Sequence, residues 1–434
     1  MAEDGLGPVQ IGLVQGEMVM TRKLEKVSRR GFMGTVAGAG VGAMVAPSLT
    51  AGTGAGDTIN VGFIGMGGRG SHLLDETLKL ADKKVKPVAV CDVYQVRLKA
   101  AQEKAKLPDG AAYADFRKLL AQPDLDAVVI ATPDHWHAPM ALEAIKAGKD
   151  IYLEKPFTHT YKEAQEVKDA AEKDKRVVQI GVNSCSESLW RDAYKLIEAG
   201  KIGKVLLTTA HHSRNSKGGE WNYDIDKAAD PNKNLDWTGF LGAAPKTSWS
   251  PERFFRWRKY WDYSGGIASD LFFHQLTHLM VALDGDSPEF PRRVSALGGI
   301  YQFWDREVPD TFSVQIDYPS NHTVILMASM ANDFGIPEAI RGHEGTIVFD
   351  GDKLALHYQK SVVGEREAVT VENQRKGGAL EHLENFYACM RDRKKPACDV
   401  ELAYKIQVAV DMMVMSFREG KTAYWNRRKE EIGF

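Results

Sequence analysis

The feature that most constrains the fold is an alternation of short apolar runs with amphipathic stretches, which continues from residue 57 to about residue 181. Short apolar runs predict buried strands, and longer amphipathic stretches predict helices. Strands are expected at 58–65, 85–93, 125–133, 150–155 and 177–182, and helices at 71–81, 94–106, 138–148 and 161–173. Repeated strand–helix–strand units favour a parallel sheet with helices on both faces. The pattern therefore predicts a doubly wound α/β domain over residues 57–181.

The rest of the chain has a different texture. After a helix expected at 188–203, strands follow one another at 205–213, 293–303, 311–318, 322–330 and 345–351, and an amphipathic helix is expected at 401–421. Strands with few helices between them favour antiparallel pairing. We therefore expect an α+β domain over residues 182–434, built on a large, mostly antiparallel open sheet. Two domains also suit a chain of 434 residues, because single cores stop growing at roughly 250–300 residues.

The first 56 residues predict a targeting segment. Arg29 and Arg30 precede a mildly apolar stretch, rich in glycine and alanine, that ends at Pro47. This arrangement is typical of a twin-arginine export signal, and a disordered basic leader is the alternative. The protein is expected in the periplasm, or otherwise exported by the twin-arginine route, and it would cross the membrane already folded.

Composition excludes several classes of protein. The chain has 56 basic and 58 acidic side chains and a net charge of −2, so nothing calls for nucleic acid or an anionic membrane as partner. Its four cysteines form no CxxC pair, which argues against a disulfide framework and a structural zinc. No convincing membrane span is present, and the mature protein is not expected to insert into a membrane.

A glycine-rich turn follows the first expected strand and begins the first helix, with the spacing Gly65-x-Gly67-x-x-Gly70. The three glycines suit a tight turn, close approach to a pyrophosphate, and close helix-to-strand packing, with the helix N-terminus facing the anion. Asp92 ends the next strand, where a carboxylate binds an adenosine ribose and repels a 2′-phosphate. A Rossmann domain that binds NAD rather than NADP is therefore expected, and a turn cluster with a helix-capping aspartate is the alternative.

Two further sites carry groups that could react. Lys155 ends a strand at the carboxyl edge of the parallel sheet, where doubly wound folds place their ligands. Asp270, His274 and His278 follow one another at intervals of four residues, which place them on one face of a helix. Helical ligands eight residues apart lie about 12 Å apart along the axis, too far for one metal ion. An acid/base site is favoured, no metal is predicted, and a buried polar seam remains open.

The motifs "IGMGGRG", "CDV", "TPDHWH", "EKPF" and "GGIASDLFFH" occur here in the order and spacing of one family. The chain resembles the glucose-fructose oxidoreductase and inositol dehydrogenase (Gfo/Idh/MocA) family from about residue 58 to its end. The resemblance implies that Lys155 lies beside the nicotinamide and the substrate hydroxyl, and that His274, paired with Asp270, transfers a proton. Histidine titrates nearest neutral pH, and Asp270 would hold its tautomer while Lys155 stabilises alkoxide character.

The expected NAD-binding residues come from the glycine turn and, by the resemblance, from four later segments. They are Gly65, Met66, Gly67, Gly68, Arg69, Gly70, Asp92, Thr132, Pro133, His135, Trp136, His137, Glu154, Lys155 and Asn183. His135 and Trp136 would face the nicotinamide pocket. The chain departs from the family pattern at His278, where a carboxylate is commoner nearby, and after Asn183, where many relatives have an arginine.

An aromatic, arginine-rich stretch at 249–263 precedes the Asp270 motif. Aromatic faces stack on sugar rings, and arginine forks bind hydroxyls or carboxylates, although packing beneath a long loop is the alternative. The substrate candidates are Trp136, His211, Arg256, Trp257, Tyr263 and His278, with His212, Arg214 and Asn215 as further candidates.

These inferences predict an NAD-dependent enzyme that oxidises a secondary hydroxyl of a sugar, glycoside or polyol, or reduces the matching ketone. The resemblance also implies a rival, a glycoside hydrolase of the α-N-acetylgalactosaminidase type that retains NAD and oxidises its sugar only transiently. A third possibility is a non-catalytic, NAD-bound sugar-binding protein. An open sheet with one uncovered face further predicts a homo-oligomer, either a dimer or a tetramer.

Overall fold

The computed structural model of the protein describes residues 58–285 and 287–434. The twin-arginine signal predicted within residues 1–56 lies outside the described residues. Within the described ranges, no helix combines the length and the apolar character that a bilayer crossing requires.

The N-terminal domain is built on a six-stranded parallel sheet with the order β3-β2-β1-β4-β5-β6. Its strands are β1 Ile59–Ile64, β2 Val85–Cys91, β3 Ala112–Tyr113, β4 Ala127–Ile130, β5 Asp150–Leu153 and β6 Val178–Ile180. Every residue of β4 and β5 is buried, because helices cover both faces of the sheet. The strand order reverses between β1 and β4, which is the place where such sheets bind ligands at their carboxyl edge.

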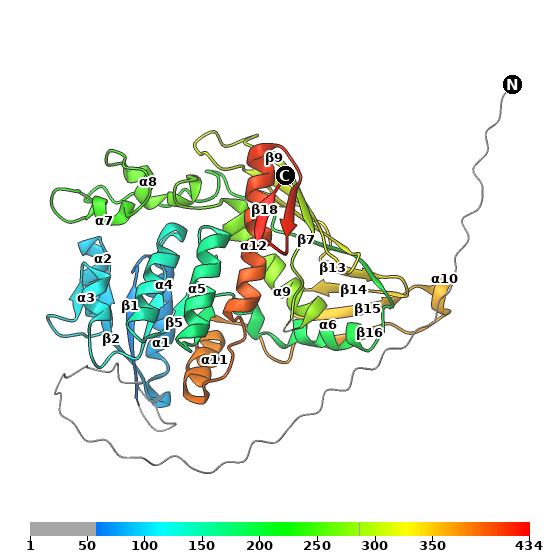
Figure 1. Cartoon of the computed structure of the whole chain (residues 1–434), viewed down its shortest axis with the longest axis horizontal. Coiled ribbons are helices and arrows are strands. Elements are labelled where there is room, and N and C mark those ends of the chain that lie inside the picture. Colours follow the sequence, from blue (N-terminus) through cyan, green and yellow to red (C-terminus); the bar gives the residue numbers. More distant parts are fainter. Residues whose placement is uncertain (1–57, 286) are drawn as a thin grey trace, which may run out of the picture. The chain divides into compact units, whose positions relative to one another are not determined.

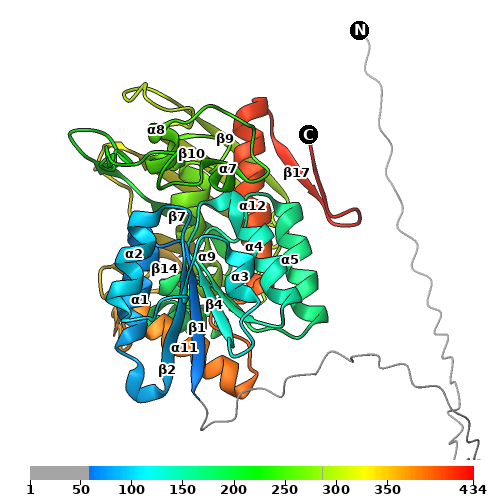
Figure 2. The same cartoon turned by 90° about the vertical axis from the view of Figure 1, so that its left-hand side faces the viewer.

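Five helices flank this sheet, namely α1 Gly68–Leu78, α2 Gln95–Lys104, α3 Phe116–Leu120, α4 His137–Lys146 and α5 Tyr161–Lys173. Figure 2 shows α1 and α2 on one side of β1 and β4, and α3, α4 and α5 on the other. α1 begins at Gly68 rather than at the predicted residue 71, because the helix starts inside the glycine turn. The prediction of a doubly wound domain is confirmed.

The C-terminal domain contains a ten-stranded sheet with the order β16-β15-β14-β13-β7-β11-β10-β9-β17-β18. Its strands are β7 Val205–His211, β9 Arg293–Gly299, β10 Thr311–Asp317, β11 Thr323–Ser329, β13 Ala339–Gly342, β14 Gly345–Asp350, β15 Lys353–Tyr358, β16 Val369–Glu372, β17 Ala423–Asn426 and β18 Glu431–Gly433. β7 and β11 pair in parallel and the other recorded pairs are antiparallel. Side chains of β10 alternate between buried and more exposed positions, as expected for a sheet covered on one face. The predicted α+β architecture is also confirmed.

The C-terminal domain sends two helices back to the N-terminal domain. α11 (Ala379–Asp392) packs on α1, and α12 (Val400–Glu419) lies between α5 and the large sheet (Figure 1). The α12 carboxylate of Asp411 accepts a hydrogen bond from the Tyr161 amide at the start of α5, at 2.5 Å. The expected amphipathic helix at 401–421 is therefore buried on several sides, because it forms the seam between the two sheets.

The remaining elements are α6 Ser188–Glu198, α7 Trp237–Leu241, α8 Pro251–Phe255, α9 Phe273–Asp284, α10 Lys360–Val363, and the two-stranded pair of β8 Arg214–Asn215 with β12 Ala331–Asn332. Of these, α7, α8 and α9 contribute residues to the cavity that the next section describes. A π-helical turn at Ala268–Phe272 runs directly into α9. Asp270 lies in this π turn, and His274 lies in the first turn of α9.

Candidate active site

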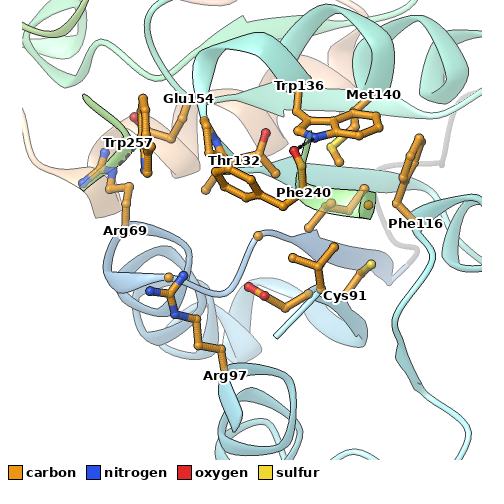
Figure 3. Close-up of a pocket in the computed structure, with 18 of the residues that line it drawn as sticks. Arg69, Cys91, Arg97, Phe116, Thr132, Trp136, Met140, Glu154, Phe240 and Trp257 are labelled. Atoms are coloured by element: carbon orange, nitrogen blue, oxygen red, sulfur yellow. Dashed lines mark hydrogen bonds and ion pairs between the residues drawn. The ribbon is translucent and has the colours of Figure 1, made fainter. Parts of the chain in front are cut away.

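A cavity of about 710 Å³ lies at the carboxyl edge of the parallel sheet and is lined by residues of both domains. The glycine turn, Thr132 and Glu154 come from the N-terminal domain, while Phe240, Trp257 and His274 come from the C-terminal domain. Figure 3 shows Thr132 and Glu154 beside Phe240 and Trp257, with Arg97 projecting from α2. A cavity of this size and position can hold an extended ligand.

The glycine turn has the geometry that a bound pyrophosphate requires. Gly65 has a φ of +87°, and a Cβ atom there would lie 2.7 Å from the Ala131 carbonyl oxygen. A Cβ atom at Gly70 would lie only 1.9 Å from the Gly65 carbonyl oxygen. Gly67 caps α1 and lines the cavity, and the nearest atom to its added Cβ would be an Arg97 nitrogen at 3.7 Å. The helix N-terminus is thus open to an anion.

Asp92 lines the same end of the cavity, but backbone groups hold its carboxylate. The Met66 amide donates to one oxygen at 2.6 Å and the Tyr94 amide donates to the other at 2.8 Å. Burial raises the pKa of the Asp92 carboxyl. The residue therefore orders the turn around a ligand as well as facing the cavity.

Arg97 is a cavity residue that the sequence analysis missed. Its guanidinium lies over Phe254 and Phe255, at 5.2 Å from each ring centroid, and it lines the cavity beside Gly67. In the sequence, Arg97 is only an arginine in the first turn of an expected helix. Many surface arginines occupy such a position, so nothing marked this one as a cavity residue. An arginine beside a glycine turn is placed to meet the phosphates or the adenosine ribose of a dinucleotide.

The remaining predicted NAD-binding residues divide into those that line the cavity and those that support it. The lining set is Gly65, Gly67, Gly68, Arg69, Asp92, Thr132, Pro133, Trp136, Glu154, Lys155 and Asn183. The Thr132 hydroxyl oxygen is buried and has no partner among the described residues. Arg69 binds Glu154 at 2.5 Å. An unpartnered buried hydroxyl beside the glycine turn fits a ligand that supplies its hydrogen bond.

Met66, Gly70, His135 and His137 do not line the cavity, and they act behind it. Both ring nitrogens of His137 are engaged, with the Pro156 carbonyl at 2.7 Å and the Thr132 carbonyl at 3.0 Å. His135 bonds the Phe240 carbonyl at 2.9 Å, and burial lowers its pKa to about 3. These imidazoles tie together the loops that hold the cavity wall.

Asp270 is the centre of a buried network of charges. Lys155 Nζ donates to its carboxylate Oδ1 at 2.7 Å and to its backbone oxygen at 2.6 Å. Arg258 Nε donates to the same Oδ1 at 3.0 Å, and Trp221 Nε1 donates to Oδ2 at 2.9 Å. Burial alone would raise the pKa of Asp270, but Lys155 and Arg258 outweigh burial and hold it well below its ordinary value. The carboxylate is therefore ionised and fixes the position of the lysine ammonium.

His274 lines the cavity close to this network. Burial and the charge of Lys155 lower the pKa of His274 well below its ordinary value, so the imidazole is neutral and can accept a proton. The expected hydrogen bond from the His274 imidazole to Asp270 is not the arrangement found, because among residues 58–285 and 287–434 the Asp270 carboxylate accepts from Lys155, Arg258 and Trp221. Three donors from distant segments therefore take the place of the histidine.

His278 lies away from the cavity. Its ring stacks on Trp190 at a centroid distance of 4.0 Å, and its Nε2 bonds Glu338 at 2.9 Å. Its Nδ1 lies 3.3 Å from the Ser184 hydroxyl. The predicted substrate contact at His278 is therefore replaced by a packing role, because the next turn of α9 points toward α6.

The other substrate candidates are also separated by the structure. Trp136 and Trp257 line the cavity. Arg256 does not line the cavity, and it donates from Nε to the Tyr223 carbonyl and from Nη1 to Glu252. Tyr263 is fully buried and does not line the cavity either. His211 lies outside the cavity lining, where Gln275 donates to its backbone oxygen at 3.1 Å.

Trp221 is the second residue that the sequence analysis missed. It is 3% exposed and has a φ of +65°, a conformation that costs energy for a side chain of this size. Its sequence context carries no signal for the contact with Asp270. In the described part of the chain, no group of three or more histidine, cysteine, aspartate or glutamate side chains is placed to hold a metal ion.

The sequence matches two family models. Residues 59–182 match "Oxidoreductase family, NAD-binding Rossmann fold", and residues 194–424 match "Oxidoreductase family, C-terminal alpha/beta domain". Among curated proteins, the chain is 31% identical over 209 residues to a "Glycosyl hydrolase family 109 protein" of Shewanella baltica, covering 46% of this chain and 42% of the relative. It is 30% identical over 233 residues to an "Alpha-N-acetylgalactosaminidase" of Shewanella oneidensis, covering 50% of this chain and 48% of the relative. The alignments thus span about half of these relatives.

Solved structures share the fold over most of the chain. Levoglucosan dehydrogenase in complex with NADH superposes with a TM-score of 0.64 at 20% identity, covering 84% of this chain and 98% of that one. The WlbA dehydrogenase from Chromobactrium violaceum, in complex with NADH and UDP-GlcNAcA, gives a TM-score of 0.65 at 19% identity, covering 88% and 99%. At these identities the likeness establishes the fold alone.

Proposed function

Because this chain belongs to the Gfo/Idh/MocA oxidoreductase family and carries its NAD-binding Rossmann domain, we propose that it transfers a hydride between a secondary hydroxyl of a sugar, glycoside or polyol and NAD. The observation that carries the proposal is the convergence of Lys155, Asp270 and His274 at one end of the cavity that the glycine turn begins. The residues are far apart along the chain, and the α9 and β5 ends bring them together.

The cavity residues fit an NAD molecule. Gly67 and the N-terminus of α1 would hold the pyrophosphate, Asp92 and Arg97 would meet the adenosine ribose, and Thr132 would donate or accept through its unpartnered hydroxyl. NAD, when bound, supplies the acceptor or donor of the hydride. Lys155 lies farther along the cavity, where the nicotinamide end would be placed, whereas Trp136 packs against Phe116 at a centroid distance of 5.8 Å, away from Glu154 and Trp257 (Figure 3).

Each reacting side chain has a defined task. The neutral imidazole of His274 accepts the hydroxyl proton as the carbinol carbon is oxidised, and returns it in the reverse direction. The ammonium of Lys155 has three N–H donors, and Asp270 occupies two of them. The third donor can bind the reacting oxygen and stabilise its developing negative charge. Asp270 positions the lysine rather than the histidine.

A second function uses the same residues. The curated relatives with 30–31% identity include an α-N-acetylgalactosaminidase and glycosyl hydrolase family 109 proteins, which favours a hydrolase that oxidises its sugar transiently. A ketone acidifies the neighbouring C–H, so elimination and hydration could cleave the glycosidic bond without net reduction of NAD. A non-catalytic NAD-bound sugar-binding protein is a third function that the same cavity would allow.

One experiment separates these functions. The purified protein is analysed for retained nucleotide and then incubated with a panel of sugars and aryl glycosides. Accumulation of reduced nicotinamide supports the dehydrogenase, and release of the aglycone without reduced nicotinamide supports the hydrolase. Binding without either product supports the sugar-binding protein, and the absence of nucleotide would contradict all three.

We also propose that the protein is exported by the twin-arginine route and forms a homo-oligomer. Export is supported by the Arg29-Arg30 stretch, and association is supported by the uncovered face of the large sheet, where Leu297 of β9 is 75% exposed. Light scattering would test association, with a dimer or tetramer expected and a monomer contradicting it. Fractionation of cells that express the full chain would test export.

A further inference from the structure

The aromatic stretch at 249–263 contains three arginines, and the structure uses them differently. Arg253 binds Asp262 and Glu307 with its two terminal nitrogens, each at 2.7 Å. Arg256 donates to the Tyr223 carbonyl at 2.8 Å and to Glu252 at 2.6 Å. Both of these guanidinium groups are therefore engaged by the protein itself.

Arg258 is different, because only its Nε is used. That nitrogen donates to Asp270 Oδ1, and neither Nη nitrogen has a hydrogen-bond partner among the residues that the structure describes. The guanidinium lies 4.2 Å from the Trp257 ring centroid and lines the cavity. Its plane is thus fixed by a carboxylate on one edge and by an aromatic ring on one face, which leaves the other edge available to bind a ligand.

The charges around Arg258 do not balance. Lys155 and Arg258 share the single carboxylate of Asp270, which leaves an excess of one positive charge in a buried site. His274 is held neutral, and Asp134, the other carboxyl that acts on Arg258, accepts a hydrogen bond from the Ser269 hydroxyl at 2.9 Å and has its pKa raised by burial. An uncompensated buried positive charge is costly, and an anionic ligand group removes that cost.

We propose that the substrate is a sugar acid, and that the Nη edge of Arg258 binds its carboxylate. The inference rests on the proposed function, because it assigns the substrate class of the same site. Lys155 Nζ and Arg258 Nε both donate to Asp270 Oδ1, so the two cations lie close together. The carboxylate of the substrate, bound by Arg258, would therefore lie close to the carbon whose hydroxyl faces Lys155. Hexuronic acids and their glycosides carry an acidic group and secondary hydroxyls on one small ring.

The experiment compares three forms of one sugar in the protein with its retained NAD. Galactose, galacturonate and galacturonamide share their ring hydroxyls and differ in the group at one carbon, and the glucose series repeats the comparison. Net oxidation to the ketone is measured by mass spectrometry with NAD added as the oxidant, and transient oxidation is followed by the absorbance of the reduced nicotinamide formed on the protein. The acid is expected to have a kcat/KM roughly tenfold or more above that of the amide, because hydrogen bonds to charged groups are the strong ones.

Two substitutions test the assignment to Arg258. Arg258→Gln should remove the preference for the acid, with a roughly 10–100-fold loss in kcat/KM for the acid and a much smaller change for the amide. Arg258→Lys keeps the positive charge but loses the forked guanidinium, so its preference for the acid should lie between those of the wild type and Arg258→Gln. Arg256→Gln is the matched control and should keep the preference, since Arg256 does not line the cavity and uses its Nε and Nη1 within the protein. Nucleotide retention shows whether each variant is folded.

The outcomes separate this inference from the proposed function. Equal oxidation of the acid and the amide, or an acid preference that survives in Arg258→Gln, would overturn the inference and leave the proposed function standing. No oxidation of any sugar, neutral or acidic, by the nucleotide-loaded protein would overturn the proposed function, and the inference with it.

Discussion

The two ends of the cavity differ in whether backbone or side chains form the binding surface. At the cofactor end it is formed by backbone groups, since Gly65, Gly67 and Gly70 shape a turn and a helix N-terminus faces the cavity. At the reacting end, side chains from distant segments meet, with Lys155 and Trp221 converging on Asp270. A site made of backbone leaves a local sequence pattern, whereas a site made of converging side chains leaves little.

Two buried carboxylates show the same contrast. Asp92 accepts hydrogen bonds from two backbone amides, and burial raises its pKa. Asp270 is equally buried, yet Lys155 and Arg258 hold its pKa well below the ordinary value despite the effect of burial. The charge of Arg97 and the two amides do not outweigh burial at Asp92, whereas two cations bonded directly to the Asp270 carboxylate do. The difference explains why one carboxylate supports a turn and the other organises a reacting centre.

The largest effect is expected where the reacting end is broken. Lys155→Met and His274→Asn should each lower turnover by roughly 10²–10⁴-fold, because they remove charge stabilisation and proton transfer. Steady-state assays with the sugar identified by the panel would measure the loss. His278→Asn, on the same helix but outside the cavity, is the control and should keep its turnover. Unaltered turnover in either of the first two variants would contradict their roles.

The cofactor end is tested by two glycines that differ in the space around them. Gly70→Ala places a Cβ atom 1.9 Å from the Gly65 carbonyl oxygen, whereas nothing lies within 4 Å of an added Cβ at Gly68. Gly70→Ala should therefore lower the free energy of unfolding by about 1–3 kcal/mol. Gly68→Ala should leave it nearly unchanged. Chemical denaturation of both variants without added nucleotide separates packing from cofactor binding, and equal stabilities would refute the steric account.

Trp221 tests whether the reacting end depends on a residue without a sequence signal. Trp221→Phe keeps an aromatic ring but removes the indole N–H that donates to Asp270 Oδ2. Turnover should fall by roughly tenfold, and the acidic limb of the pH profile should move to higher pH, since the carboxylate loses a donor. Trp237→Phe, which removes a donor to the Thr247 carbonyl, is the matched control. Equal effects of the two substitutions would show that Trp221 is only structural.

The smallest effect is a difference in how stability depends on pH. Asp270 has a depressed pKa in the folded protein, so its contribution is present above its unfolded value of about 3.9 and is lost as the pH falls. Asp92 has a raised folded pKa, so stability declines as the pH rises through that range. The deficit of Asp270→Asn relative to the wild type should therefore shrink toward acid pH.

Asp92→Asn should show the opposite trend, because its free energy of unfolding should increase relative to that of the wild type as the pH rises. Urea unfolding of Asp270→Asn from about pH 4 downward, and of Asp92→Asn from about pH 4 upward, measures the two slopes on either side of the ordinary aspartate pKa. Slopes of the same sign would contradict the contrast between a carboxyl whose pKa is raised by burial and one whose pKa is lowered by two adjacent cations.

The sequence predicted the fold well because hydrophobic periodicity determines which segments become strands and helices. α5 was predicted with its observed bounds, and the parallel and antiparallel sheets were assigned to the correct halves of the chain. Short strands such as β13 and β15 were missed, because their pairing depends on distant partners. α11 was missed as well.

The site was predicted in part for the same physical reason. The glycine turn and Lys155 follow buried strands, so their position at the sheet edge could be inferred from order alone. Arg258 could be told from Arg256 only in three dimensions, where Arg256 uses Nη1 on Glu252 and Arg258 uses Nε alone. The π turn at Ala268–Phe272 and the contact of Asp270 with Lys155 could not be inferred from the four-residue spacing.

The most direct test of the central claim follows a single isotope. The protein with its retained NAD is mixed with a sugar that carries deuterium at the carbon to be oxidised, and the nucleotide is then examined by mass spectrometry. The account predicts deuterium on the nicotinamide in the wild-type protein and its loss in Lys155→Met. A sugar that is converted to product while the nucleotide carries no label, in samples quenched during the reaction as well as after it, would contradict hydride transfer at this site.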